Sequence, residues 1–278
     1  MNTTDATDVL VVTGGHPFEA KPFFAVFDDL PGIEWHGATA PEPGHDVVVF
    51  YDLPGLRFTR ADPPAELLEP SADQRAVIDQ LCADGAGLVF LHHAVAGWPA
   101  WPEYAELIGG RFHYQPGRLR GVDYPDSGYV FDVTHTVEVL APEHPVCAGL
   151  GREFTLTDEL YCFPVLADDL IPLMRTTFDT ADPARFSSAD LAIRGRRESN
   201  DGWTHPPGSD LVAWARQAGR SRVVYLQFGD GPVTYADSSF RRALANAIQW
   251  AGHRRVSGPP SGTQTLGRAE NLGWEGPG

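Results

Sequence analysis

Residues 87–93 read Gly-Leu-Val-Phe-Leu-His-His, and this stretch decides the fold that the sequence predicts. Its uninterrupted apolar run is typical of a strand that is buried on both faces, as the strands of a parallel sheet are. Two further runs of this kind lie upstream, at residues 8–13 and 46–51. The two histidines stand at the carboxyl end of the predicted strand, on the edge of a parallel sheet where ligands bind.

Helical segments are expected between these strands. Residues 18–30 follow the first strand, and a second helix begins near Ser71, because Ser71 and Gln74 have the spacing of a capping box. Gly85 and Gly87 end that helix. An alternation of strand and helix needs crossover connections, so it predicts an α/β domain with a mostly parallel sheet.

The second half of the chain is less regular. The expected elements are strands at residues 130–140 and 170–176, a β-hairpin whose strands 211–214 and 223–228 flank a turn at 217–220, and a helix at 238–251. Residues 179–210 are rich in Arg, Asp, Ser, Gly and Pro, and we expect a plain surface loop there rather than a lid. One domain is expected over residues 8–252, followed by a disordered tail at 253–278.

The charge and composition of the chain exclude several kinds of partner. Its 37 acidic and 21 basic side chains give a formal net charge of −16, and such a surface repels nucleic acid and anionic membranes. We see neither an apolar run of about 18 residues nor the pattern of a signal peptide, so the cytoplasm is expected. Cys82, Cys147 and Cys162 lack C-x-x-C spacing, which predicts neither a disulfide framework nor a thiolate zinc cluster.

The histidines His16, His92 and His93 are the best candidates for chemistry, since each follows a predicted strand. Histidine titrates near neutral pH, so His92 or His93 could be a general base, and imidazoles also bind metals. The alternative is that one of the pair packs in the core. We expect all three in one cleft, with one of the pair facing inward and its neighbour outward. Three imidazoles fall short of a structural zinc site, so we expect no tightly held zinc, at most a weak or open metal site, and no cofactor.

Carboxylates and aromatic rings supply weaker candidates. Asp158 and Glu159 could orient an imidazole or contact sugar hydroxyls, although such carboxylates more often lie in a solvated loop. Trp98 and Tyr104 follow the histidine pair, and aromatic faces pack well on sugar rings, although core packing is the commoner explanation. The chain has no Gly-x-Gly-x-x-Gly, P-loop or Gly-x-Ser-x-Gly motif, which disfavours a nucleotide-phosphate site and a hydrolase serine.

Several motifs, in the order in which they stand, resemble those of the ThuA-like (trehalose utilisation) proteins. They are Val-Val-Thr-Gly-Gly-His at residues 11–16, Gly-Leu-Val-Phe-Leu-His-His-Ala at 87–94, Trp-Pro-Glu-Tyr at 101–104, Ile-Gly-Gly-Arg-Phe at 108–112, His-Pro-Val at 144–146, Asp-Glu-Leu-Tyr at 158–161, Gly-Arg-Ser-Arg-Val-Val-Tyr at 219–225 and Ala-Ile-Gln-Trp at 247–250. The resemblance covers roughly residues 8–252.

The resemblance implies a flavodoxin-like, doubly wound sheet of the class I glutamine amidotransferase-like kind, ending in a β-hairpin and a helix. True amidotransferases carry a cysteine where this chain has His92 and His93, so glutamine hydrolysis is not expected. Two histidines that are common in the family are replaced here by Gln115 and Asp230. The residues expected to bind substrate are His16, Trp98, Tyr104, Gln115, Asp158, Glu159, Tyr161 and Asp230.

Two functions are open at this point. The family is associated with the catabolism of disaccharides and their keto forms. The chain could be a hydrolase or another sugar-modifying enzyme that acts on such a compound, with a histidine of the pair as general base. It could also be a non-catalytic carbohydrate-binding or regulatory domain, which the two replaced histidines favour. In both cases the expected partner is a small-molecule carbohydrate, and a homo-oligomer is an open alternative to a monomer.

Overall fold

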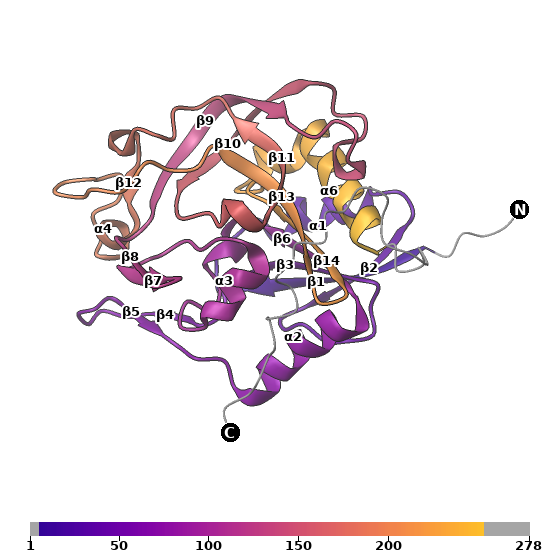
Figure 1. Ribbon diagram of the computed structural model, residues 1–278, viewed down its shortest axis with the longest axis horizontal. Coiled ribbons are helices and arrows are strands. Elements are labelled where there is room, and N and C mark those ends of the chain that lie inside the picture. Colours follow the sequence, from indigo (N-terminus) through magenta and orange to yellow (C-terminus); the bar gives the residue numbers. More distant parts are fainter. Residues whose placement is uncertain (1–5, 253–278) are drawn as a thin grey trace, which may run out of the picture.

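A β-sheet with helices on both faces forms the centre of the protein (Figure 1). The computed structural model describes residues 6–252, so the tail expected at 253–278 lies outside the described residues. The order of strands in the sheet is β10-β9-β11-β13-β14-β6-β3-β1-β2. In the middle of the sheet, β14 from the C-terminal part of the chain therefore lies beside β6 from the N-terminal part.

Half of the sheet is parallel. Its strands are β2 (Ile33–Ala38), β1 (Thr7–Gly14), β3 (Val47–Asp52), β6 (Gly87–Leu91) and β14 (Ser221–Leu226). The three apolar runs of the sequence are β1, β3 and β6, as predicted. This doubly wound α/β arrangement has the strand order of a flavodoxin-like sheet and confirms the expected fold class.

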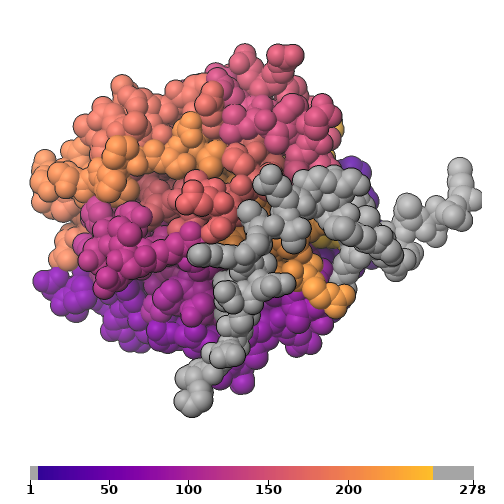
Figure 2. All heavy atoms as spheres, viewed as in Figure 1, coloured from indigo at the N-terminus to yellow at the C-terminus, as the bar shows by residue number. Residues whose placement is uncertain are grey.

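The other half is antiparallel and extends the sheet beyond β14. Its strands are β13 (Leu211–Ala218), β11 (Ile171–Thr176), β9 (Gly128–Val139) and β10 (Glu153–Cys162), and the short β12 (Ser187–Ser188) pairs with β9. The pair β13–β14 is the predicted hairpin. Figure 2 shows the same division at the surface, where the N-terminal segments in indigo and purple lie below the segments in magenta to orange.

Alternate residues of the central strands enter two separate cores. Val89 faces the core that contains α1 (Ala20–Asp28) and α6 (Ser238–Gly252), whereas Phe90 faces the core that contains α2 (Ala72–Asp84) and α3 (Pro102–Ile108). Both side chains are fully buried. Side chains of a strand alternate between its faces, so a strand covered on both sides must be apolar throughout.

The predicted start and end of α2 are confirmed, whereas α1 is shorter than the predicted helix at residues 18–30. Ser71 caps α2 through a capping box, in which its hydroxyl accepts from the Gln74 N–H and the Gln74 side chain accepts from the Ser71 N–H. Gly85 ends this helix in the left-handed conformation. Gly87 allows α6 to lie close to β6, because a Cβ at this position would stand 2.6 Å from the carbonyl carbon of Ala251.

Short elements lie at the carboxyl edge of the parallel strands and along the antiparallel half of the sheet. They are β4 (Leu56–Phe58), β5 (Ala65–Leu67), β7 (Gly117–Leu119), β8 (Val122–Tyr124), α4 (Ala189–Ile193), α5 (Pro232–Ala236) and the 3₁₀ turns η1 (His92–Ala96), η2 (Pro145–Cys147), η3 (Ala167–Asp169) and η4 (Pro183–Arg185). Within residues 6–252, no helix has both the length and the apolar character needed to cross a membrane. The three cysteines are buried and unpaired.

Candidate functional site

The three predicted histidines meet at the carboxyl edge of the sheet. The ring of His16, just after β1, stacks on the ring of His93 with 4.3 Å between centroids, and the rings of His92 and His93 are 5.7 Å apart. Gly15 makes the approach of the β1 loop possible, since a Cβ there would stand 2.4 Å from the carbonyl oxygen of Leu53. The three histidines therefore lie together at this edge, as expected, but His92 and His93 are buried and only His16 lines a pocket.

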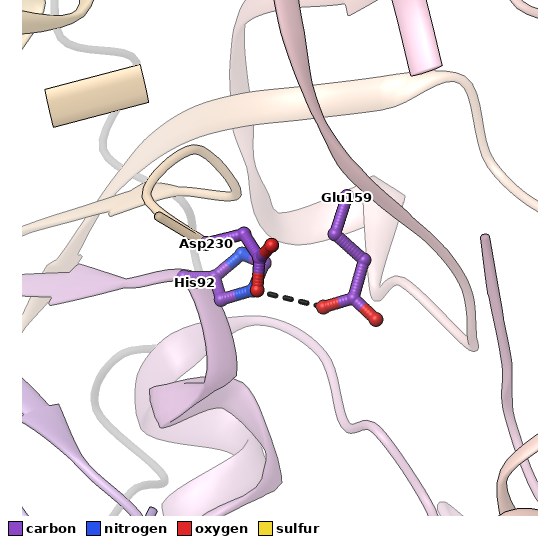
Figure 3. A group of neighbouring side chains, drawn as sticks. All are labelled: His92, Glu159 and Asp230. Atoms are coloured by element: carbon purple, nitrogen blue, oxygen red, sulfur yellow. Dashed lines mark hydrogen bonds and ion pairs between the residues drawn. The ribbon is translucent and has the colours of Figure 1, made fainter. Parts of the chain in front are cut away.

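His92 is held by hydrogen bonds at both ring nitrogens. Its Nδ1 lies 2.6 Å from the carbonyl oxygen of Gln227, which can only accept, so Nδ1 carries a proton. Its Nε2 lies 3.0 Å from Oε2 of Glu159, 2.7 Å from the hydroxyl of Tyr161 and 3.6 Å from Oδ1 of Asp230 (Figure 3). The backbone of His92 is in the left-handed region, at φ +49°, which turns the chain sharply out of β6.

The carboxylates Asp158 and Glu159 lie in a strand, not in the solvated loop that the sequence left open. They sit in β10 at a shift of its register with β9, and both side chains are buried. Asp158 accepts from the backbone N–H groups of Gly229 at 2.8 Å and Asp230 at 3.0 Å. This contact fastens the loop after β14 to β10 and holds Asp230 beside His92.

The electrostatics of this group follow from its burial. Burial opposes a charge on His92, but its interactions with Asp230 and Glu159 outweigh burial and raise the pKa of His92 well above its usual value. Burial raises the pKa of Glu159 and of Asp158. For Asp230 the contact with His92 outweighs burial and lowers the pKa. The geometry therefore favours a positive charge between these carboxylates.

His16 and His93 are uncharged partners of this group. Burial, reinforced by the neighbouring imidazoles His16 and His92, lowers the pKa of His93 well below its usual value. Burial and the charge of His92 likewise lower the pKa of His16. His93 is 2% exposed and donates from Nε2 to the carbonyl oxygen of Tyr51 at 3.2 Å, so the expectation that one of His92 and His93 faces outward is wrong.

A pocket of about 500 Å³ opens in front of the histidines and carboxylates, and we call it the aromatic pocket. It is lined by His16, Pro17, Phe58, Phe112, Tyr114, Tyr129, Phe131, Glu159, Tyr161, Ala189, Ala192, Ile193, Arg197 and Asp230. Four of these, His16, Glu159, Tyr161 and Asp230, belong to the expected substrate-binding set. Residues 179–210 are therefore more than a plain surface loop, because α4 and Arg197 form one wall of the pocket.

The other expected substrate-binding residues do not line the pocket. Tyr104 is buried in the core, where its ring contacts Phe90 and Trp101. Trp98 packs against the segment at Gly55. Gln115 donates to the carbonyl oxygen of Ala65 at 3.1 Å, in the β4–β5 hairpin. Asp158 lies behind the pocket wall, and its hydrogen bonds to the loop after β14 hold Asp230 in that wall.

The sequence reasoning missed most of the aromatic lining. Tyr129 and Phe131 are two residues apart on β9 and project to the same face, with their ring centroids 5.0 Å apart. That spacing was the available signal, since Phe131 is a half-exposed aromatic residue on a predicted strand. Phe58 and Arg197 reach the pocket through short elements for which the sequence had no pattern.

One group in the structure has the donors for a metal ion. Ligand atoms of His92, Glu159 and Asp230 all lie within 4.8 Å of one another, and we call these residues the carboxylate–histidine cluster. The expected imidazole group is arranged differently, because His16 and His93 stack face to face instead of converging on one point.

Comparisons with known proteins agree with the fold. Residues 35–251 match the model of a family named ThuA and described as trehalose utilisation. Similar solved structures include ThuA-like proteins of Parabacteroides merdae (TM-score 0.64, 13% identity, 91% of this chain and 92% of that one) and Bacteroides uniformis (0.58, 17%, 90% and 94%). A cytoplasmic protein of Salmonella typhimurium is also similar (0.53, 12%, 88% and 98%). No curated protein sequence matches the chain.

Proposed function

Because the chain belongs to the ThuA family, the family of trehalose utilisation, we propose that it is an enzyme that modifies a disaccharide or a keto-sugar derivative in the aromatic pocket. The observation that carries the proposal is the pocket itself. It combines aromatic walls with ionisable side chains at one end, which is the usual composition of a small-molecule site.

The aromatic walls suit the apolar faces of sugar rings. Tyr114, Tyr129 and Tyr161 line the pocket, and their rings can pack on the C–H groups of a pyranose. Glu159 and Asp230 offer carboxylate oxygens that accept hydrogen bonds from hydroxyl groups. A sugar would therefore find both kinds of contact that it needs.

His16 is the side chain best placed to take a proton from the substrate. It lines the pocket, and burial lowers its pKa so that the imidazole is neutral near pH 7. His93 lies behind it, and His92 is hydrogen-bonded at both nitrogens. We therefore propose His16 as the base, in place of His92 or His93, which the sequence suggested.

The reaction that fits this arrangement is proton removal beside a ketone. His16 takes the proton from the carbon next to the carbonyl group, and the C–H electron pair moves toward the carbonyl oxygen. The hydroxyl group of Tyr161 lines the pocket and can donate a hydrogen bond to the oxygen on which negative charge develops. The first product is an enediolate, from which isomerisation or loss of a neighbouring group can follow.

The test measures exchange of that proton. The protein is incubated in D₂O with the 3-keto forms of trehalose and of other disaccharides, and deuterium uptake is followed by NMR. His16→Gln should slow exchange by about 10²–10⁴-fold, the usual contribution of a general base. His36→Gln is the matched control, because His36 is exposed on β2 and far from the pocket lining.

A non-catalytic carbohydrate-binding domain is the second candidate. Gln115 and Asp230 stand where many members of the family have histidines, and this departure favours it. Calorimetric binding of sugars with neither exchange nor turnover on any of them would select this candidate over the enzyme.

A further inference from the structure

Three elements that are far apart in the sequence bring oxygen and nitrogen ligands together beside the aromatic pocket. His92 follows β6, Glu159 lies in β10, and Asp230 lies between β14 and α5 (Figure 3). We propose that this carboxylate–histidine cluster binds a divalent first-row transition ion, such as Mn²⁺ or Zn²⁺. The metal site is inferred from these contacts alone, whereas a role of the ion in catalysis rests on the proposed function.

The distances fit a shared ion. An ion bound at about 2.0–2.2 Å by nitrogen and oxygen ligands holds neighbouring ligand atoms roughly 3.0–3.5 Å apart. The Nε2 atom of His92 lies 3.0 Å from Oε2 of Glu159 and 3.6 Å from Oδ1 of Asp230. The side chain of Asp230 is one-third exposed, so a small rotation of this side chain brings its oxygen into place.

The orientation of His92 is that of a ligand. Its Nδ1–H donates to the carbonyl oxygen of Gln227 at 2.6 Å, which aims Nε2 at the carboxylates. Metal-binding histidines almost always donate their second ring N–H in this way. Tyr161 contacts Nε2 at 2.7 Å and is also within hydrogen-bonding reach of Glu159, so its hydroxyl can donate to that carboxylate when an ion occupies Nε2.

The charges of the cluster favour a divalent cation over a single proton. Glu159 is buried and Asp230 is two-thirds buried at its side chain, so together they place two negative charges around one imidazole. A proton on His92 leaves one of these charges uncompensated, whereas a divalent ion bound to neutral His92 balances both. Buried charges are stable only when they are paired or bind a metal.

The backbone around the site is already fixed. Asp158 accepts from the N–H groups of Gly229 and Asp230, and this holds the Asp230 loop in place without using the Asp158 carboxylate as a ligand. Three protein ligands leave positions of the ion free on the side of the pocket. A ketone or hydroxyl oxygen of a sugar would fill such a position, where the ion would polarise it.

The experiment uses the full chain after removal of metals with a chelator. Binding of Mn²⁺ is measured by electron paramagnetic resonance and binding of Zn²⁺ by calorimetry, each alone and without sugar. We expect one ion per chain and a higher melting temperature when it binds. Asp230→Asn and Glu159→Gln should weaken binding by at least about 100-fold, as loss of a ligand costs more than the 10–100-fold of an outer contact.

Two further variants separate ligation from charge. Asp230→His removes the negative charge but keeps a ligand atom, so it should bind the ion far better than Asp230→Asn. Glu103→Gln is the matched control, because Glu103 is an exposed carboxylate on α3 that does not line the pocket. Circular dichroism checks the fold of each variant.

The outcomes are distinct. Binding that Asp230→Asn and Glu159→Gln leave unchanged, or the absence of stoichiometric binding to the parent chain, would overturn the site. If the ion binds as expected but no sugar exchanges or turns over, the proposed function fails and the site stands. If the chelator-treated protein keeps full exchange activity, the ion has no part in catalysis.

Discussion

At the scale of single residues, Asp52 is a buried carboxyl group outside the carboxylate–histidine cluster. It ends β3, it is 6% exposed, and its Oδ1 has no hydrogen-bond partner within residues 6–252. Burial raises the pKa of Asp52 to about 7. A carboxyl group that binds its proton more tightly in the folded than in the unfolded chain makes stability fall as pH rises.

Asp52→Asn should therefore remove part of the pH dependence of folding. The pKa of Asp52 is about 7 in the folded chain and 3.8 in the unfolded chain, so the cost of ionising this group grows between these two pH values and is constant above pH 7. With about 1.4 kcal/mol for each pKa unit, the wild type should lose about 3 kcal/mol relative to the variant between pH 5 and pH 8. Urea unfolding at both pH values measures this difference.

The control for this prediction is an exposed aspartate. Asp73 lies in the first turn of α2, and Asp73→Asn should shift stability equally at both pH values. The idea is wrong if the Asp52 variant shows the same pH profile as the wild type.

At the scale of elements, α6 and β6 are in close contact at Gly87. Gly87→Ala would place a Cβ 2.6 Å from the carbonyl carbon of Ala251 and 2.7 Å from its Cβ. These atoms belong to a buried helix end, so the helix must move. We expect a loss of about 1–3 kcal/mol, the usual cost of overpacking, measured by urea unfolding.

Gly231→Ala is the matched glycine. Its φ is −162°, which any residue adopts, and a Cβ there would have no atom within 4 Å. It should leave the free energy of unfolding nearly unchanged. Equal stability of the two variants would show that α6 shifts at no cost.

Elements with a local pattern were predictable from the sequence. The strands β1, β3 and β6 are apolar throughout because both faces are covered, and Ser71 with Gln74 marks the start of α2. Elements stabilised by distant partners were not. The β12–α4 segment forms because Ser187 pairs with Tyr129, which no window of sequence can show.

The residues of the site also divide into those that a local pattern predicts and those that depend on distant partners. His16 and His92 could be placed together because each follows a parallel strand, and such strands end at one edge. The burial of Glu159 depends on His92, 67 residues away, so the sequence offered only an exposed loop as the commoner alternative. The prediction that Tyr104 and Trp98 line the pocket was wrong, because the sequence does not distinguish an aromatic residue of a core from one of a sugar site.

At the scale of the whole molecule, the net charge of −16 should make stability depend on salt. Raising NaCl from about 10 mM to about 150 mM shortens the screening length from about 30 Å to about 8 Å and weakens repulsion among the acidic side chains. The exposed Arg–carboxylate pairs also weaken, but each is worth little. We expect the melting temperature at pH 7 to rise by a few degrees, measured by calorimetry with a chelator present.

The same series at pH 5 is the control. The computed isoelectric point is about 4.9, so the chain carries little net charge there and the effect should largely vanish. A melting temperature that falls with salt at pH 7 would mean that the exposed pairs outweigh the overall repulsion.

The position of β14 beside β6 has a consequence for synthesis on the ribosome. At about 5–20 residues per second, translation needs roughly 7–26 s to add the ~130 residues between Leu91 and Ser221. During that interval the nascent chain holds β1, β3 and β6 with the apolar edge of β6 unpaired and without α6 to cover one face. Open strand edges pair readily with other chains. Neighbouring nascent chains on one messenger would therefore be the nearest wrong partners, and a chaperone that shields this edge until β14 emerges would decide how much of the protein reaches its native state.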